Sequence, residues 1–155
     1  MQRQFSSLLA FLLFFGASAE AAKLKNVEMT DSMQVEAKNL VLNGMGLRKV
    51  VRYGIPVDVY IAGLYLEKKE QNSESIIKSA SVKRLVLHFV RTLERDDLIN
   101  AFQTGYKDNC QVECDRASEQ FKPFAAALVS VRDKTRMQFT FYPDRVVYEV
   151  DRPNK

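Results

Sequence analysis

The order in which hydrophobic periodicities follow one another constrains the fold of this chain more than any single motif. Between Lys23 and Arg91 most of the chain consists of strand-like runs, with one short helix among them. From Glu94 to about Val131 the apolar residues instead recur at helical spacing. The closing segment "RMQFTFYPDRVVYEVD" returns to the strand period around a Pro-Asp turn. Strands, then helices, then strands predict an α+β fold, with helices covering one face of a mostly antiparallel sheet.

Several strands can be assigned individually. The runs "KNLVLNGMGLRKVVRY", "PVDVYIAGLYLEKK" and "VKRLVLHFVR" are rich in the residue types that strands favour. In the last run Leu85 and Phe89 share one face, while Val86 and His88 share the other. We interpret His88 as a packed, hydrogen-bonded side chain, with a general acid or base as the alternative. The segment "NSESIIKSAS" predicts a short helix with a Ser or Asn start.

Two longer helices are predicted between the strand regions. The first extends from Glu94 to about Asn109, and one face carries Leu98, Phe102, Gly105, Tyr106 and Asn109. Core packing is the default interpretation of Tyr106, and a hydroxyl lining a cleft is the alternative. Asn109 is either a cap at the helix end or a donor in a cleft. The second helix is expected to run to Val131, with Pro123 opening its regular part as a first-turn residue.

The N-terminal residues have the pattern of a secretory signal peptide. "MQRQ" is followed by the apolar run "FSSLLAFLLFFGA" and by the small-residue cleavage site "ASA". We expect residues 1–19 to be removed, with a cut after Ala21 as the alternative. The run is shorter than the roughly 20 residues of a membrane span, so an uncleaved anchor is the less favoured interpretation. A single exported, soluble domain from Lys23 to Lys155 is expected, periplasmic in a Gram-negative host and otherwise secreted.

Composition and charge argue against several classes of function. Hydrophobic residues make up 46% and charged residues 27%, which is typical of a globular domain. The net charge of +4 is mild, and the absence of a Lys/Arg block argues against nucleic-acid binding. One histidine and two cysteines do not make a metal site, and no cofactor is predicted.

Cys110 and Cys114 in "CQVEC" are candidates for a disulfide, which export would permit. A bridge requires the chain to turn there, because this spacing on an unbroken helix gives poor disulfide geometry. Two free, half-buried thiols are the alternative.

The stretch "GMGLRKVVRYGIPVDVYIAGLYLE" predicts a hairpin. If Tyr53 to Ile55 form a three-residue loop, Arg48 stands opposite Tyr60 and shares its face. Gly44 and Gly46 would lie nearby and leave the sheet surface hollow. A guanidinium beside a phenol suits a ligand with an acidic or carbonyl end. The alternative is an Arg48 that pairs with an acidic residue such as Asp58 on a solvated face.

These motifs resemble a known family. "NGMGLRK", "VYIAGLYLEKK", "KRLVLHFVR" and the helix segment "AFQTGYKDNC" are similar to the bacterial chalcone isomerase-like domain, a set of exported relatives of chalcone isomerase and of fatty-acid-binding proteins with its fold. The resemblance covers roughly Lys23 to Asp151. It implies an open-faced β-sandwich, with an antiparallel sheet, helices on one face and a ligand cleft between them. Family members continue with a further strand and an apolar helix, so the resemblance implies a natural short form, a truncated reading frame or a fragment.

The resemblance also implies roles for individual residues. Arg48 matches the arginine that helps to hold the substrate in chalcone isomerases, and Asn109 matches an asparagine near the end of the helix, just before a cysteine. Tyr60 instead replaces a threonine, and Phe102 replaces a tyrosine, of the catalytic network. The loss of these donors argues against closure of a flavanone ring, which needs stabilisation of a developing enolate. Arg48 with Tyr60 is instead similar to the pair that grips a carboxylate in the fatty-acid-binding branch.

The leading hypothesis is therefore an exported, non-catalytic binding protein for a small apolar ligand with an acidic head. Arg48 and Tyr60 would hold the head group with Asn109 nearby, and Phe102, Tyr106 and Leu64 would lie along the ligand. The alternatives are an isomerase or lyase acting on a carbonyl compound, and an envelope protein-interaction module without a ligand.

Overall fold

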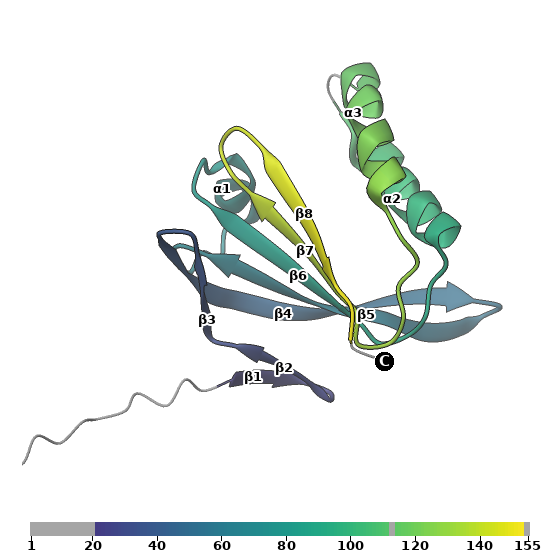
Figure 1. Ribbon diagram of the computed structural model, residues 1–155, viewed down its shortest axis with the longest axis horizontal. Coiled ribbons are helices and arrows are strands. Elements are labelled where there is room, and N and C mark those ends of the chain that lie inside the picture. The colour runs from purple at the N-terminus through teal and green to yellow at the C-terminus, as the bar shows by residue number, and fades with distance from the viewer. Residues whose placement is uncertain (1–20, 112–113, 154–155) are drawn as a thin grey trace, which may run out of the picture.

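A single six-stranded antiparallel sheet forms the body of the molecule, and each strand pairs with its neighbours in sequence (Figure 1). The computed structural model describes residues 21–111 and 114–153, so the predicted signal peptide, residues 1–19, lies outside the described residues. The strands of this sheet are β3 Ser32–Val35, β4 Lys38–Arg52, β5 Ile55–Leu66, β6 Lys83–Phe89, β7 Arg136–Phe141 and β8 Val146–Asp151. A separate hairpin of β1 Ala21–Leu24 and β2 Val27–Thr30 precedes the sheet.

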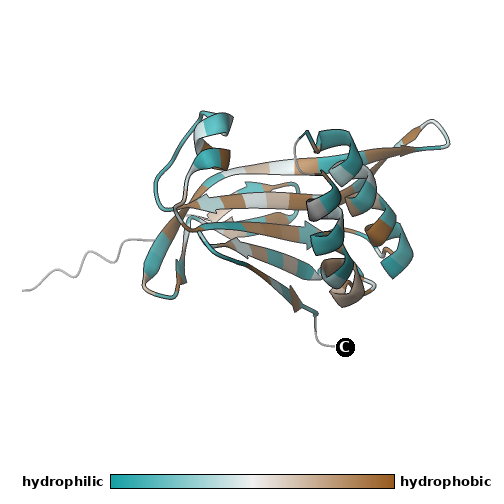
Figure 2. Cartoon of the chain, turned by 90° about the horizontal axis from the view of Figure 1, so that it is seen from above, coloured by the Kyte–Doolittle hydropathy of each residue, from teal (hydrophilic) through white to brown (hydrophobic). Residues whose placement is uncertain are grey.

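Three helices interrupt the strands. The short helix α1 Ser73–Lys78 follows β5, and Asn72 caps it by accepting a hydrogen bond from the Ser75 amide. Between β6 and β7 the chain leaves the sheet to form α2 Arg95–Asn109 and α3 Cys114–Ala127. Figure 2 shows α2 and α3 lying across one face of the strands, toward the end where the turn between β4 and β5 projects. The predicted α+β arrangement with helices on one face is confirmed.

The two faces of the sheet bury different clusters. On the face away from α2 and α3, a cluster that includes Leu40, Ile61 and Tyr65 packs beneath the β1–β2 hairpin, which contributes Val27 and Met29. The Tyr65 hydroxyl donates to the Thr30 carbonyl at 3.0 Å, which ties that hairpin to the sheet. The opposite face carries the cluster under the helices: Leu87, Phe89, Leu98, Leu128, Val131, Met137 and Phe139. The alternation expected of β6 is therefore confirmed.

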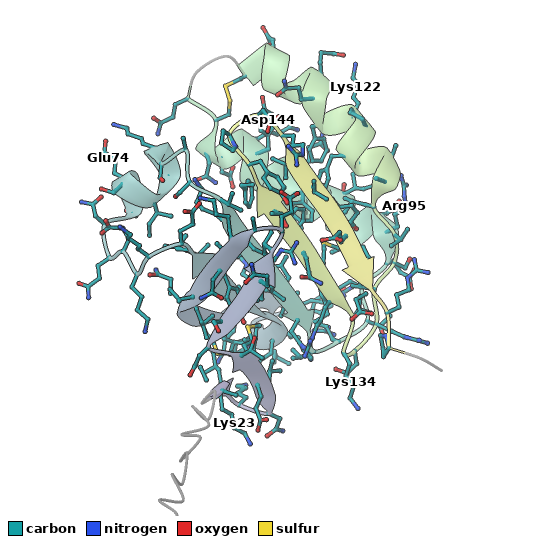
Figure 3. All side chains as sticks on the ribbon, turned by 60° about the vertical axis from the view of Figure 1, so that its left-hand side comes forward. Lys23, Glu74, Arg95, Lys122, Lys134 and Asp144 are labelled. Carbon is teal, nitrogen blue, oxygen red and sulfur yellow. A yellow bond between two sulfur atoms is a disulfide. The ribbon has the colours of Figure 1, made fainter. Side chains whose placement is uncertain are left out.

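The helix pair is attached to the sheet at one end. A backbone bridge joins Leu93 to Val131, so the two connecting segments run side by side. The Arg95 side chain donates to the carbonyls of Leu128 and Ala125 at 2.9 and 2.8 Å, and the Ser130 hydroxyl donates to Glu94 at 2.9 Å. These bonds hold the start of α2 against the end of α3. At the far end of the pair a disulfide joins Cys110 to Cys114 (Figure 3).

Two sequence-based boundaries are wrong. α3 ends at Ala127 instead of Val131, because Leu128 and Val131 form the buried return to the sheet. Pro123 lies inside α3 and does not open it. Among the described residues, no helix is both long and apolar enough to cross a bilayer.

The turn of the central hairpin also differs from the prediction. Arg52 pairs with Ile55, so the loop is the two-residue turn Tyr53-Gly54, and both residues have positive φ, 53° and 76°. Positive φ at both central positions is the geometry that matches the twist of the flanking strands. The shorter loop shifts the register by one residue, and an unpaired Val59 shifts it back, since Lys49 pairs with Asp58 and Arg48 with Tyr60.

Close packing at Gly63 gives the first prediction. A Cβ atom at Gly63 would lie 2.2 Å from the Met29 sulfur, whereas one at Gly46 would meet nothing within 4 Å. Gly63→Val should therefore lower the free energy of unfolding by about 1–3 kcal/mol through overpacking beneath the β1–β2 hairpin. Gly46→Val is the matched control and should change it little. Urea unfolding measures both, and equal losses would contradict this packing.

The environment of His88 gives a pH prediction. This half-buried side chain has an Nδ1 atom without a hydrogen-bond partner among the described residues, so the expected hydrogen-bonded histidine is not seen at that atom. Burial, assisted by the Arg136 charge, lowers the pKa of His88 below its usual value of 6.5. The unfolded chain consequently binds a proton more readily as the pH falls through 6.5, and this group then opposes folding.

The urea midpoint of the wild type should fall more between about pH 7.5 and pH 5.5 than that of His88→Gln, whose side chain does not titrate. All other groups are common to the two proteins, so the difference isolates His88. Parallel pH profiles would show that His88 protonation does not affect stability.

Candidate functional site

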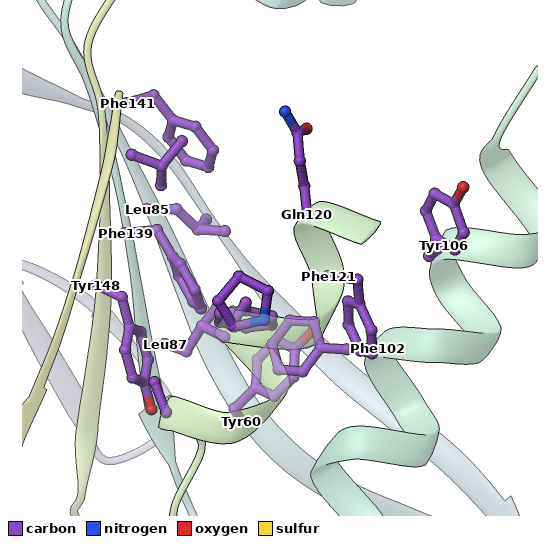
Figure 4. Close-up of a pocket in the computed structure, with 14 residues that line it drawn as sticks. Tyr60, Leu85, Leu87, Phe102, Tyr106, Gln120, Phe121, Phe139, Phe141 and Tyr148 are labelled. Atoms are coloured by element: carbon purple, nitrogen blue, oxygen red, sulfur yellow. The ribbon is translucent and has the colours of Figure 1, made fainter. Parts of the chain in front are cut away.

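A cleft lies between the helix-facing side of the sheet and the α2–α3 pair. Its larger chamber has a volume of about 830 Å³. Figure 4 shows side chains from β6, β7 and β8 facing those from the two helices across it. The lining residues are Tyr60, Leu85, Leu87, Phe102, Tyr106, Gln120, Phe121, Pro123, Phe124, Ala127, Phe139, Phe141, Val146 and Tyr148.

A smaller chamber of about 580 Å³ adjoins the first on the β4–β5 side. It is lined by Arg48, Val50, Val59, Tyr60, Leu87, Phe89, Leu93, Leu98, Ala101, Phe102, Gly105, Tyr106, Asn109, Phe121 and Phe124. The two chambers share Tyr60, Leu87, Phe102, Tyr106, Phe121 and Phe124. Both volumes are in the range of about 300–1,000 Å³ that small-molecule sites occupy.

Aromatic side chains form the boundary shared by the chambers. Phe102 on α2 contacts Phe124 on α3 edge to face, with ring centroids 5.1 Å apart, and it contacts Phe139 on β7 at 6.0 Å. Phe124 in turn contacts Tyr148 on β8 at 5.6 Å. These contacts hold the helices above the sheet through large side chains, which leaves space on both sides of the contact.

Among the described residues that line the two chambers, Arg48 is the only charged one. It stands directly opposite Tyr60, as the sequence predicts, although the bulge at Val59 and not a three-residue loop produces the pairing. The acidic alternative fails, because Asp58 is within ion-pair distance of Lys25 and, at 3.9 Å, of Lys49. Within the described residues no carboxylate pairs with Arg48, so its charge has no protein counter-ion beside an apolar cleft.

Two other polar groups of the smaller chamber have protein partners. The Tyr106 hydroxyl donates to the Cys114 carbonyl, and the Tyr106 ring stacks on Phe121 with centroids 6.4 Å apart. The Asn109 amide donates to the Gly105 carbonyl at 2.7 Å, which corresponds to the helix-end cap among its two interpretations. Asn109 nevertheless lines the chamber. The disulfide that follows it joins the ends of α2 and α3 at this side of the cleft.

The predicted ligand-binding residues come together in space. Arg48, Tyr60, Phe102, Tyr106 and Asn109 all line the smaller chamber; their role toward a ligand stays a prediction. Gly44, Gly46 and Leu64 line neither chamber, so the expected hollow beside the glycines is not where the cavity lies. The smaller chamber is instead bounded by one face of α2, which carries Leu98, Phe102, Gly105, Tyr106 and Asn109.

Sequence reasoning missed the wall formed by β7 and β8. Phe139, Phe141 and Tyr148 line the larger chamber, and the alternation in "RMQFTFYPDRVVYEVD" carries the signal that could have placed them on one face. The Tyr148 hydroxyl is buried without a hydrogen-bond partner among the described residues, and burial raises the pKa of this phenol.

An antiparallel sheet that carries a helix pair over an apolar cleft defines an α+β domain with a helix-covered sheet face. The model of the chalcone isomerase-like family matches residues 21–154, and the chain belongs to this family. A solved structure with a similar fold is a fatty-acid-binding protein of Arabidopsis thaliana, with a TM-score of 0.68 and 17% identity over 84% of this chain and 78% of the plant chain. The fold is thus the α+β open-faced sandwich of chalcone isomerase type. No curated protein has a sequence that matches this chain.

The hydroxyl groups of Tyr148 and Tyr65 give a matched prediction, because one lacks a hydrogen-bond partner among the described residues and the other has one. Tyr148→Phe removes an unsatisfied hydroxyl and should raise the free energy of unfolding of the ligand-free protein by about 1 kcal/mol. Tyr65→Phe removes a hydroxyl that is bonded to Thr30 and should lower it by about 1 kcal/mol. Urea denaturation of both variants tests the contrast. A loss of stability in Tyr148→Phe would mean that this hydroxyl has a partner in solution.

Proposed function

We propose that this protein is an exported, non-catalytic binding protein for a small apolar ligand with an acidic head group, such as a fatty acid. The observation that carries the proposal is the guanidinium of Arg48, which lies at an apolar cleft opposite a phenol and has no counter-ion in the part of the protein that the structure describes. Export is supported by the signal-peptide pattern of residues 1–19 and by the Cys110–Cys114 disulfide, since such bridges persist in oxidising compartments.

The head group would bind between Arg48 and Tyr60. A guanidinium offers a planar fork of donors that matches the two oxygens of a carboxylate, and the Tyr60 hydroxyl would add a third donor. Arg48 is solvent-exposed at the edge of the smaller chamber in the ligand-free protein, so a ligand bound over it would reduce the screening of this contact by water. A cation that already had a carboxylate partner in the protein would not be available in this way.

The apolar part of the ligand would pass the shared aromatic residues and enter the larger chamber. Its lining is almost entirely aliphatic and aromatic, and its polar members are Tyr60, Tyr106, Gln120 and Tyr148. Burying a methylene group there contributes about 0.8 kcal/mol. The fatty-acid-binding protein of Arabidopsis thaliana, which has the same fold, supports this class of ligand.

Binding is favoured over isomerase chemistry by the state of the polar groups in the cleft. Phe102 has no hydroxyl, Tyr106 donates to Cys114, and Asn109 donates to Gly105. Stabilising a developing enolate needs donors that are oriented toward the reacting oxygen. Among the polar residues that line the smaller chamber in the described structure, Arg48 and Tyr60 have side-chain donors without a protein acceptor, and their arrangement suits a carboxylate equally well.

The test compares two neighbouring cations on opposite faces of β4. Arg48→Ala should weaken binding of a long-chain fatty acid about 10–100-fold in titration calorimetry, since a charge-assisted hydrogen bond contributes about 1.5–3 kcal/mol. Lys49→Ala, whose side chain points away from the cleft toward Asp58, should bind like the wild type. Tyr60→Phe should weaken binding less than Arg48→Ala.

A fatty alcohol of the same chain length separates the head from the tail. It lacks the carboxylate, so the wild type and Arg48→Ala should bind it with the same, lower affinity. Equal affinity of the wild type and Arg48→Ala for the fatty acid would contradict the head-group role of Arg48. Turnover of a chalcone-type substrate would contradict a non-catalytic function.

A further inference from the structure

The outer part of the β4–β5 hairpin projects from the sheet as a two-stranded arm (Figure 1). Within the described structure, β6 pairs with β5 only from Tyr60 onward, and β3 pairs with β4 only from Val41 backward. The turn residue Tyr53 is five positions beyond Arg48, which corresponds to about 16 Å of ribbon at the usual strand rise. The arm therefore extends away from the cleft while remaining continuous with it. We refer to residues 49–58 as the hairpin arm.

Apolar side chains gather at the end of the hairpin arm. Tyr53 is 92% exposed, Val51 74% and Ile55 64%, and Val50 is 38% exposed where the arm meets the smaller chamber. Single exposed apolar residues are common on proteins, but a cluster at the tip of a projecting element marks a contact surface. An amphipathic aromatic ring such as that of Tyr53 is the type enriched at the interface between a membrane and water.

Positive charge surrounds these apolar residues. Arg48, Lys49 and Arg52 lie on β4 between the cleft and the turn, and the Arg52 guanidinium is 5.9 Å from the Tyr53 ring centre. Asp58 is the only acidic residue of the arm, and Lys25 and Lys49 both contact it. The hydrogen bond from Lys25 lowers the pKa of this carboxyl, so Asp58 stays ionised and neutralised by its partners. Arg52 has no such partner among the described residues.

We propose that the hairpin arm docks on the surface of an anionic lipid bilayer, with Tyr53, Val51 and Ile55 inserted among the head groups and Arg52 and Lys49 beside the lipid phosphates. Apolar residues surrounded by basic ones are the pattern of proteins that bind at the bilayer interface, where each basic residue adds roughly fivefold in affinity. Charge complementarity favours lipid over a second copy of this chain, because a symmetric contact would place the same cations against one another.

Docking in this way would face the cleft toward the bilayer. Insertion of the turn by about 5–10 Å leaves Arg48 close above the head groups, given the length of the arm. Val50 lies between the tip and the smaller chamber, so an amphiphile leaving the bilayer would follow an apolar path to Arg48. This consequence rests on the proposed function, whereas the docking itself does not.

The experiment measures co-sedimentation with vesicles of phosphatidylcholine containing about one-third phosphatidylglycerol, and with pure phosphatidylcholine. The wild type should bind the anionic vesicles, and more weakly as salt is added. Arg52→Glu with Tyr53→Ser should lower the affinity at least tenfold. The matched control is Ile77→Ser with Lys78→Glu on α1. It removes another highly exposed apolar residue, 78% exposed, and reverses one charge at a distance from the arm. The control should bind like the wild type.

The proposal would be overturned if the wild type did not bind anionic vesicles, or if the arm variant and the control variant lost equal affinity for them. It would also be overturned if the wild type formed a concentration-dependent dimer that only the arm variant abolished, while the arm variant still bound vesicles. Fatty-acid binding in vesicle-free solution is measured in parallel and should be unchanged in the arm variant. If the wild type binds vesicles but no fatty acid, the proposed function fails and the docking stands. If the wild type binds fatty acid but no vesicles, the membrane docking fails and the proposed function stands.

Discussion

The antiparallel pairing of β4 with β5 is the interaction on which both the sheet and the cleft depend. These two strands form the longest ladder of the sheet, and their pairing places Arg48 opposite Tyr60 on the face below the helices. The unpaired Val59 compensates for a turn one residue shorter than the strand register would otherwise need. Without that bulge the outer arm would reverse its faces relative to the cleft, because strand side chains alternate with a period of two.

The cleft exists because the helix pair is held close to the sheet only at one end. Hydrogen bonds around Arg95 and the Leu93–Val131 bridge fix that end of the helix pair. Along the rest of the pair, the rings of Phe102 and Phe124 stand between the helices and the sheet and keep them apart. A helix pair packed through small residues would close the space. The same large side chains that stabilise the domain therefore also line its chambers, which is why no separate set of binding residues was needed to create an apolar site.

Local patterns predicted much of this arrangement. The stripe on α2 was readable from Leu98 to Asn109, and all of its members line the smaller chamber. The pairing of Arg48 with Tyr60 was also predicted, but from a three-residue loop. The loop has two residues, and the pairing is correct only because the unpaired Val59 restores the register. The wall formed by Phe139 and Tyr148 was missed, since their alternation shows that they share a face without showing which face the helices cover.

What the sequence alone determined is the class of fold and the identity of the chemical groups: strands around a helix pair, one cation and one phenol on a hairpin, and an aromatic stripe. Only the tertiary structure decided that Asp58 pairs with Lys25 and Lys49, that no described carboxylate pairs with Arg48, and that Tyr148 lines the larger chamber. Periodicity reports the direction of a side chain relative to its own backbone. Ion-pair partners and cavities depend on how elements distant in sequence are arranged in space, and a local sequence pattern does not determine that arrangement.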